Sequence, residues 1–319
     1  MNRKIRYGVL GCAGIATKHV IPAMVKADNA IPYAIASRDI LKAKAITERF
    51  GFEKSYGSYE EILNDENVDA VYIPLPNALH KEWVIKAAKA KKHILCEKPL
   101  ALSEEDVKEM ITAAEENGVK LMEAYMYRFT PRCAKLKELL DQGIIGKIGQ
   151  VISNYSFYLS DYTNIRVSPA LGGGCLHDVG CYPINLLGWI THDYPKSICA
   201  QMIERNGVDV SLSASLVYES GIMGVVNCSF MGDSEEMTEI TGEKGTLVIR
   251  DTYYDTDLPI LFYHNDQEIA FPVEACNRYQ KEIEAFSDCI INDTPVPLDL
   301  NESVRNNKLI KEILEVAKR

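Results

Sequence analysis

Apolar residues in the first 123 positions follow two alternating spacings. Short apolar runs have the length of buried strands, and they occur at Ile5–Leu10, Pro32–Ser37, Val68–Ile73, His93–Glu97 and Val119–Glu123. Between these runs, apolar residues recur every three or four positions, as they do on the buried face of a helix. Strands that alternate with helices predict a parallel sheet covered by helices on both faces. We therefore expect residues 1–123 to form an α/β domain with a doubly wound parallel sheet, the Rossmann arrangement.

After residue 124, apolar and polar residues alternate instead. This period of two predicts strands in the ranges 151–159, 198–204, 208–218, 222–230, 236–241, 246–249 and 259–264. Amphipathic patterns predict helices at 131–142, 278–291 and 303–319. We therefore expect residues 124–319 to form a C-terminal α+β domain with a large, open and mostly antiparallel sheet.

Composition and charge narrow the class of protein. The chain has 319 residues, of which 47% are hydrophobic, so it is long enough for two domains with separate cores. Its net charge of −10 and the lack of a Lys/Arg cluster argue against nucleic acid or an anionic membrane as partner. We see no apolar run that could span a membrane and no signal peptide, so we expect a cytoplasmic protein. The nine cysteines include no Cys-x-x-Cys pair, and the histidines lack metal-ligand spacing, which favours reduced thiols and no metal.

Residues Tyr7–Ala16 read YGVLGCAGIA, an apolar strand that leads through a glycine turn into a helix. Gly11 permits the tight turn, Ala13 is small enough for a pyrophosphate to approach, and Ala16 lets the helix pack close to the strand. The N–H groups at the start of that helix would hold the phosphates. Ala13 replaces the second glycine of the usual pattern, and an ordinary tight turn is the alternative interpretation.

The end of the second strand indicates which dinucleotide is used. An NAD site usually has Asp or Glu there, which binds the ribose 2′-hydroxyl. This chain has Ser37 and Arg38 instead, and a guanidinium is well suited to a 2′-phosphate. NADP(H) is therefore the predicted cofactor, with NAD(H) as a weaker possibility. Asp39 is expected to cap the next helix, and Arg38 as a solvated surface charge is the alternative.

Lys98 directly follows the strand that ends at Glu97, where a parallel sheet binds its ligands. Its ammonium group could polarise a carbonyl oxygen or lower the pKa of a neighbour. An ordinary surface lysine is the alternative interpretation.

A glycine-rich segment, LGGGCLHDVGCYPIN, interrupts the strands of the second half at Leu171–Asn185. The three glycines let the backbone pass close to something. Asp178 and Tyr182 are four residues apart and share a helix face, with Asn185 one turn further on. A tyrosine pKa of about 10 is high for proton transfer, and Lys98 would lower it if the two halves face each other. The alternative is a glycine loop that caps a helix with ordinary polar residues.

Six segments in order (GCAGIA, SRD, PLPNALHKE, EKPLA, EAYMYRFTP and the glycine-rich segment) resemble the glucose-fructose oxidoreductase, inositol dehydrogenase and rhizopine catabolism (Gfo/Idh/MocA) family. The resemblance covers essentially the whole chain. Tyrosine four residues after the aspartate fits the branch with glucose-fructose oxidoreductase, dihydrodiol dehydrogenase, xylose dehydrogenases and sugar 3-ketoreductases. That branch commonly uses NADP, in agreement with Ser37 and Arg38.

The resemblance implies roles for individual residues. Lys98 and Tyr182 would be the catalytic pair, and Asp178 would bind substrate or relay a proton. Residues implied in cofactor binding are Gly11, Cys12, Ala13, Gly14, Ile15, Ser37, Arg38, Leu75, Pro76, Asn77, His80, Glu97, Lys98 and Arg166. Residues implied in substrate binding are Lys98, Tyr127, His177, Asp178, Tyr182 and Asn185. Ile165-Arg166 replaces the Trp-Arg pair of many relatives, so any stacking by the tryptophan is lost.

The expected activity is reversible hydride transfer between nicotinamide and a carbonyl or secondary alcohol of a sugar or sugar derivative. In reduction, Tyr182 would donate the proton and Lys98 would stabilise the developing charge. A trans-dihydrodiol dehydrogenase is the main enzymatic alternative. A dinucleotide-binding regulator of the same fold is a further alternative, although a regulator should lack the catalytic pair. The exposed face of the second sheet, where relatives associate, would make a homodimer or homotetramer.

Overall fold

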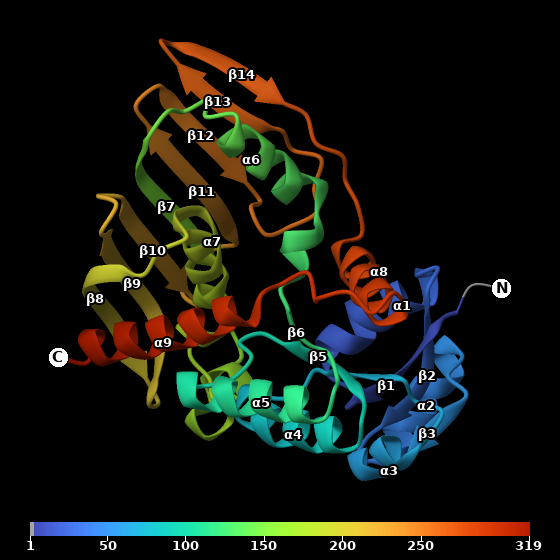
Figure 1. Ribbon diagram of the computed structural model, residues 1–319. Helices are drawn as coiled ribbons and strands as arrows, with labels where there is room; N and C mark the ends of the chain where they lie inside the picture. The colour runs from blue at the N-terminus through green and yellow to red at the C-terminus, as the bar shows by residue number, and fades with distance from the viewer. Residues whose placement is uncertain (1–2) are drawn as a thin grey trace. The chain divides into compact units, whose positions relative to one another are not determined.

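The computed structural model describes residues 3–319, which form two compact units (Figure 1). The first unit contains the chain up to Met126 and the segment Asn277–Ser303, and the second contains Tyr127–Cys276 and Val304–Arg319. The two-domain expectation therefore needs one correction. Helix α8 (Arg278–Ile291), assigned above to the C-terminal domain, packs on α1, β1 and β2 of the first unit. Its buried Ile283 and Phe286 complete the core there, a contact that sequence position does not reveal.

The first unit is built on a six-stranded sheet in the order β3-β2-β1-β4-β5-β6, and every pairing in it is parallel. The strands are β1 (Ile5–Leu10), β2 (Ala30–Ala36), β3 (Lys54–Tyr56), β4 (Ala70–Ile73), β5 (His93–Glu97) and β6 (Leu121–Ala124). This order confirms the doubly wound Rossmann arrangement. Strand β3 was not predicted, because its three residues carry no buried apolar side chain. The order reverses between β1 and β4, where such sheets bind their ligands at the carboxyl edge.

Helices flank this sheet, and most of them have a side-chain cap. They are α1 (Ile21–Lys26), α2 (Ile40–Phe50), α3 (Tyr59–Asn64), α4 (His80–Lys89), α5 (Glu104–Glu116) and α8. Asp39 accepts a hydrogen bond from the Leu41 N–H at 3.1 Å, so the predicted cap of α2 is confirmed. Ser58 and Glu61 form the capping box of α3. The helix after β1 departs from the prediction, because it opens with one π-helical turn, Ala16–Val20, before α1 begins.

The second unit is built on an eight-stranded sheet in the order β14-β13-β12-β11-β7-β10-β9-β8. Its strands are β7 (Ile148–Ser156), β8 (Pro195–Arg205), β9 (Val208–Tyr218), β10 (Met223–Ser229), β11 (Glu235–Gly242), β12 (Gly245–Arg250), β13 (Ile260–His264) and β14 (Gln267–Phe271). Only β7 and β10 pair in parallel, so the mostly antiparallel sheet is confirmed. Strand β14 was missed, because its edge position leaves four of its five residues exposed and removes the apolar alternation.

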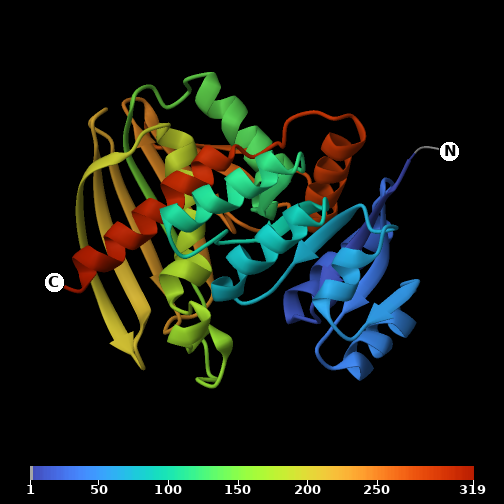
Figure 2. The same cartoon turned by 60° about the horizontal axis from the view of Figure 1, so that its bottom comes forward.

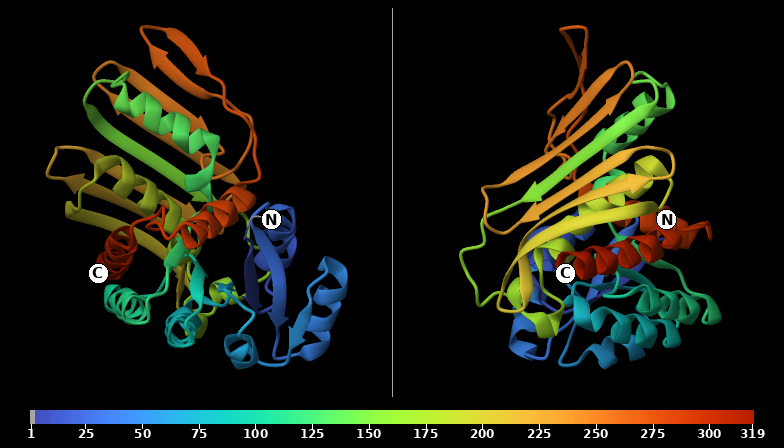
Figure 3. Two further views of the ribbon diagram at one scale, coloured as in Figure 1. Left: turned by 45° about the vertical axis from the view of Figure 1, so that its right-hand side comes forward. Right: turned by 90° about the vertical axis from the view of Figure 1, so that its left-hand side faces the viewer.

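Helices α6 (Pro131–Asp141) and α7 (Cys181–Thr191) lie on one face of this sheet (Figure 2 and Figure 3). Helix α7 contacts β7 and β10, the strands at the centre of the sheet. The last helix is α9 (Leu300–Ala317). Among the described residues, no helix is both long and apolar enough to cross a membrane.

Candidate functional site

The turn after β1 has the geometry that the phosphate-loop prediction requires. Gly11 has φ = +113°, and its N–H donates to the Ala36 carbonyl at 2.9 Å, which closes the turn against β2. A side chain at Gly11 would be strained at this φ and would approach Leu75 Cδ2 to 3.3 Å. Gly14 is exposed, and a Cβ placed there would have no atom within 4 Å. The outer side of the loop can therefore accept a ligand close to the backbone.

The carboxyl end of β2 presents a hydroxyl and a guanidinium. The buried Ser37 accepts a hydrogen bond from the Asp39 N–H at 3.2 Å, and Arg38 is exposed. Burial raises the pKa of the Tyr59 hydroxyl, and the nearby Arg38 partly opposes this effect. Burial also raises the pKa of the Cys12 thiol, against a hydrogen bond with Ser37. Cys12, Ser37, Arg38 and Tyr59 thus gather at adjacent strand ends, as a site for the adenosine side of a dinucleotide requires.

His80 does not have the placement expected of a cofactor ligand. Its side chain is fully buried, with Nε2 2.8 Å from the Leu75 carbonyl and Nδ1 3.0 Å from the Pro99 carbonyl. Burial lowers the pKa of this imidazole. His80 therefore connects the turn after β4 with the turn after β5, and its role as a cofactor ligand stays a prediction. Pro76 and Asn77, by contrast, are half-buried at the end of β4.

Lys98 is half-buried in the turn that follows β5, and the Lys98–Pro99 peptide bond is cis. The preceding Glu97 accepts a hydrogen bond from the buried Tyr72 hydroxyl at 2.5 Å. Two residues later, the Leu100 N–H donates to Glu123 Oε1 at 2.8 Å. Hydrogen bonds on both sides of Lys98 thus fix the backbone that carries it.

The three glycines of the second unit pass close to the chain itself. A Cβ at Gly173 would lie 2.5 Å from the Arg166 carbonyl oxygen. Gly174 has φ = +116°, and a Cβ there would lie 2.1 Å from Asp209 Oδ1. Asp209 Oδ2 in turn accepts from the Leu176 N–H at 2.7 Å, at the start of the next helix. The close approach predicted from the sequence is therefore explained by protein atoms, and the Asp209 carboxylate of β9 caps the helix that follows the glycines.

A buried thiol pair lies beside this cap. The Sγ atoms of Cys175 and Cys228 are 3.5 Å apart, and the Cys175 thiol donates to Asp209 Oδ2 at 3.1 Å. Burial raises the pKa of Cys175 well above its usual value. One ligand atom from each of these three residues lies within 4.8 Å of the others, a grouping that the sequence spacing did not suggest. The Asp209 carboxylate accepts hydrogen bonds from the Leu176 N–H and the Cys175 thiol, and we therefore interpret it as part of the helix cap.

Asp178 and Tyr182 lie on one continuous helical segment, although not on a plain α-helix. Residues Leu176–Gly180 form a π-helical turn that runs directly into α7, an irregularity that is frequent at functional sites. Asp178 Oδ2 accepts from Arg166 Nε at 2.6 Å, and this carboxylate raises the pKa of the Arg166 guanidinium. Arg166, expected beside the cofactor, is thus held by Asp178. His177 is half-buried with Nδ1 3.3 Å from the Gly173 carbonyl, and burial lowers its pKa.

Tyr182 is 4% exposed and lies in a cluster of four tyrosines. Its ring centroid is 6.0 Å from Tyr127, 5.3 Å from Tyr155 and 5.2 Å from Tyr253, and we call these four residues the tyrosine cluster. The Tyr127 hydroxyl donates to Asn185 Oδ1 at 2.5 Å. The structure therefore brings together Tyr127, Tyr182 and Asn185, three of the predicted substrate residues.

Sequence reasoning missed two members of the cluster and one carboxylate beside it. Tyr155 reads as an ordinary strand residue, and Tyr253 lies in an irregular loop after β12. Glu236 is buried and pairs with Tyr155 across β11 and β7. Burial, with the Glu236 charge as a smaller cause, raises the pKa of both Tyr155 and Tyr253. Only the period-two position of Tyr155 and Glu236, both on inward-facing positions of their strands, could have indicated them. The prediction that Lys98 lowers the pKa of Tyr182 joins residues of different units, and it stays a prediction.

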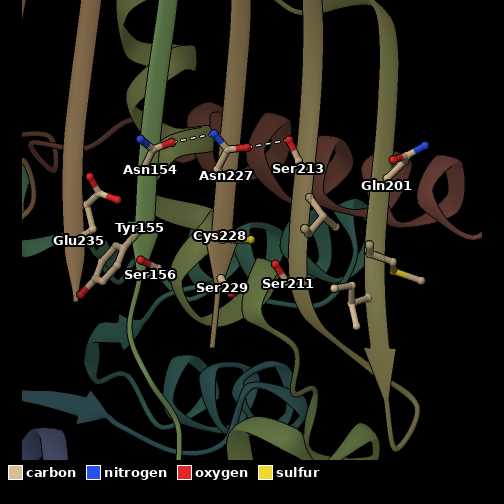
Figure 4. Close-up of a pocket in the computed structure, with 13 residues that line it drawn as sticks. Asn154, Tyr155, Ser156, Gln201, Ser211, Ser213, Asn227, Cys228, Ser229 and Glu235 are labelled. Carbon is tan, nitrogen blue, oxygen red and sulfur yellow. Dashed lines mark hydrogen bonds between the residues drawn. The ribbon is translucent and has the colours of Figure 1, made fainter. Parts of the chain in front are cut away.

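A cavity of about 540 Å³ lies on the sheet, lined by short runs of consecutive residues from β7, β10, β9 and the edge strand β8, together with Glu235 of β11 (Figure 4). Asn227 Nδ2 donates to Asn154 Oδ1 at 2.7 Å, and Ser213 Oγ donates to Asn227 Oδ1 at 2.6 Å, so three strands share a polar ladder. None of the predicted catalytic or cofactor residues lines this cavity.

Comparison with known proteins agrees with these features. Residues 5–125 match the oxidoreductase family with an NAD-binding Rossmann fold (Gfo/Idh/MocA), and residues 133–248 match the C-terminal domain of that family. The NADP(+)-dependent D-xylose 1-dehydrogenase 2 of Haloferax volcanii is 37% identical over 316 residues, which cover 98% of this chain and 97% of that protein. Trans-1,2-dihydrobenzene-1,2-diol dehydrogenase of Mus musculus is 31% identical over 333 residues, or 99% and 96% of the two chains.

A solved structure extends the likeness to three dimensions. A 3-ketoreductase from Actinomadura kijaniata, in complex with NADP and TDP-benzene, superposes with a TM-score of 0.93 at 30% identity and covers 98% of each chain. The family matches, the relatives and the fold thus agree with the resemblance in the sequence motifs. The chain belongs to the Gfo/Idh/MocA family and is an oxidoreductase with an NAD(P)-binding Rossmann domain.

Proposed function

We propose that this protein is an NADP(H)-dependent oxidoreductase that interconverts a carbonyl and a secondary alcohol on a sugar or sugar derivative. The observation that carries the proposal is the enclosed setting of Tyr182, on a helix that also presents Asp178 and Asn185. Lys98, at the carboxyl end of β5, supplies the cationic partner that such chemistry needs. The named activities of the xylose dehydrogenase and the 3-ketoreductase support the same class of substrate.

The residues of the first unit fit an NADP(H) cofactor. The backbone of Gly11–Ile15, which is open at the exposed Gly14, would hold the pyrophosphate, and the exposed Arg38 with Ser37 would bind the 2′-phosphate through charge-assisted hydrogen bonds. Asp39 would not compete for the ribose, because its carboxylate caps α2. Leu75, Pro76, Asn77 and Glu97 would line the nicotinamide side. The bound cofactor supplies or accepts the hydride.

In the reducing direction, Tyr182 would donate its proton to the substrate oxygen as the hydride reaches carbon. An ordinary tyrosine pKa of about 10 is high for proton transfer, so a cationic neighbour is needed to bring it toward neutrality. The Lys98 ammonium would supply that charge and stabilise the developing alkoxide. Asp178, Asn185, Tyr127 and His177 would bind substrate hydroxyl groups.

Two alternative functions lead to different experimental expectations. The likeness to the mouse dihydrodiol dehydrogenase keeps an aromatic trans-diol as an alternative substrate, and four tyrosine rings would suit it. A regulator that binds dinucleotide without turnover is opposed by the presence of both Lys98 and Tyr182.

The test is a set of turnover assays read at 340 nm. NADPH oxidation is measured with keto-sugars and keto-dTDP-sugars, and NADP⁺ reduction with aldoses and with trans-benzene dihydrodiol. We expect turnover with a sugar, lowered by roughly 10²-fold to 10⁴-fold in Tyr182→Phe. Turnover with the dihydrodiol alone would overturn the substrate class, and dinucleotide binding with no turnover on either panel would favour the regulator.

We also propose that the protein is cytoplasmic and forms a homodimer or homotetramer. The sheet face that bears the polar ladder and the exposed Met223 would be the interface. Multi-angle light scattering gives the assembly, and Met223→Glu should lower the measured mass if this face is used. A monomeric mass for the unmodified protein would refute the assembly.

A further inference from the structure

A network of buried hydroxyl groups lies next to the tyrosine cluster. The Tyr253 hydroxyl is 2.6 Å from Ser153 Oγ, and Ser153 Oγ is 2.7 Å from Thr238 Oγ1. Thr252 Oγ1 lies 3.0 Å from Thr238 Oγ1 and donates to the Ile249 carbonyl at 2.9 Å. We call Tyr253, Ser153, Thr238 and Thr252 the hydroxyl network. Each of the four is at most 5% exposed.

The end of the hydroxyl network limits what it can do. Its last acceptor is the Ile249 carbonyl, which can take a hydrogen bond but cannot pass a proton on. A proton-relay role for the network is therefore excluded. Buried hydroxyl groups are costly unless they are hydrogen-bonded, and together these four satisfy one another. What the network does is to hold the Tyr253 hydroxyl at one position.

The position of Tyr253 matters because its ring touches every other member of the tyrosine cluster. It stacks on Tyr155 at 5.5 Å and 7°, and it meets the edge of Tyr127 at 5.1 Å and 88°. Its contact with Tyr182 is tilted, at 5.2 Å and 43°. Aromatic contacts of this kind tolerate sliding, whereas a hydrogen bond fixes one position. The hydroxyl of Tyr253 is thus held by a hydrogen bond within the sheet, and its ring contacts Tyr182.

We propose that Tyr253 is a positioning residue for the reaction, held by Ser153, and that it fixes the orientation of the Tyr182 ring toward substrate. This inference rests on the proposed function, in which Tyr182 is the proton donor. Ser153 and Thr238 face each other directly across β7 and β11, so the network ties the tyrosine cluster to the centre of the sheet. A misplacement of about 1 Å in such a group costs on the order of 100-fold in rate.

The experiment removes the Tyr253 hydroxyl and keeps the ring. Tyr253→Phe should lower kcat by about 10-fold to 100-fold, while KM and the Kd for NADPH change less than about twofold. Ser153→Ala removes the hydrogen-bond partner of the Tyr253 hydroxyl and should also lower kcat. Tyr218→Phe is the matched control, because Tyr218 is equally buried in this unit and its hydroxyl is hydrogen-bonded to Thr191. The control should lose comparable thermal stability and keep its kcat.

A double variant separates positioning from general structural damage. If Tyr253 acts through Tyr182, then adding Tyr253→Phe to a Tyr182→Phe protein should not lower kcat further. Additive losses, or a Tyr253→Phe protein with unchanged kcat, would overturn the inference while the proposed function stands. Full activity of Tyr182→Phe alone would instead overturn the proposed function. If Tyr253→Phe does not fold, the same comparison of single and double variants is made with Ser153→Ala in its place.

Discussion

Glu123 makes the stability of the first unit depend on pH in a direction that can be stated in advance. The side chain is 2% exposed, and it accepts hydrogen bonds from the Leu100 N–H and from the Ser303 hydroxyl. Burial raises its pKa from 4.5 to about 7, against the opposing effect of these hydrogen bonds. A carboxyl with a raised pKa binds its proton more tightly in the folded protein than in the unfolded one. Its stabilising contribution is therefore complete below about pH 4.5 and is lost as pH rises to about 7.

The size of the effect follows from the same pKa. A change from 4.5 to about 7 corresponds to about 3 kcal/mol, at about 1.4 kcal/mol for each pKa unit. Glu123→Gln imitates the protonated acid, because the amide oxygen can accept from Leu100 and the amide nitrogen can donate to Ser303. We therefore expect the variant to lose this pH dependence. Near pH 5 it should match the wild type within about 1 kcal/mol, and above pH 7 it should be the more stable by about 3 kcal/mol.

Urea unfolding at pH 5, 6, 7 and 8, followed by circular dichroism, measures this difference. Glu116→Gln, at an exposed position on α5, is the control for loss of a charge and should run parallel to the wild type. Parallel curves for wild type and Glu123→Gln would show that the carboxyl is already ionised in the folded protein at pH 5, and would refute the reasoning.

Three further predictions concern single side chains. Arg38→Ala should lower the preference for NADPH over NADH, measured as the ratio of kcat/KM with the two cofactors, by roughly tenfold to hundredfold. An unchanged preference would show that Arg38 does not bind the 2′-phosphate. Tyr182→Phe should lower kcat by roughly 10²-fold to 10⁴-fold with little change in the Kd for NADPH, and near-full turnover would rule it out as the acid. Gly174→Ala should lower Tm strongly, because its Cβ would lie 2.1 Å from Asp209 Oδ1 at φ = +116°. Gly118→Ala, at φ = +64° with no atom within 4 Å, is its control and should lose less stability.

The sequence predicted the fold well where burial controls the residue pattern. The central strands β1, β4 and β5 are covered on both faces, so their apolar runs mark them closely. Strands β3 and β14 have few buried side chains, so no local sequence pattern predicted them. The packing of α8 on β1 is a long-range contact, which periodicity along the chain cannot express.

The same distinction between local pattern and long-range contact applies to the residues of the candidate site. Residues that follow strand ends or share a helix, such as Ser37 or Tyr182, could be proposed from the sequence, and their roles stay predictions. Tyr253 reaches Tyr182 only through tertiary packing, and nothing in its own segment marks it. His80 was proposed as a cofactor ligand from its place in a motif, whereas its contacts with two backbone carbonyl groups, which link two turns, depend on the fold.

The division of the first unit over two chain segments has a consequence for how the protein is made. Helix α8, whose Ile283 and Phe286 are fully buried, is synthesised about 150 residues after the last strand of the sheet it covers. While the second unit emerges from the ribosome, the β1–β2 surface beneath α8 stays uncovered, and the nascent chain must be protected from aggregation in that interval. A gene fragment that stops at residue 126 would leave the same surface open. Chimeras that exchange this unit between relatives must therefore carry residues 277–303 along with the N-terminal segment.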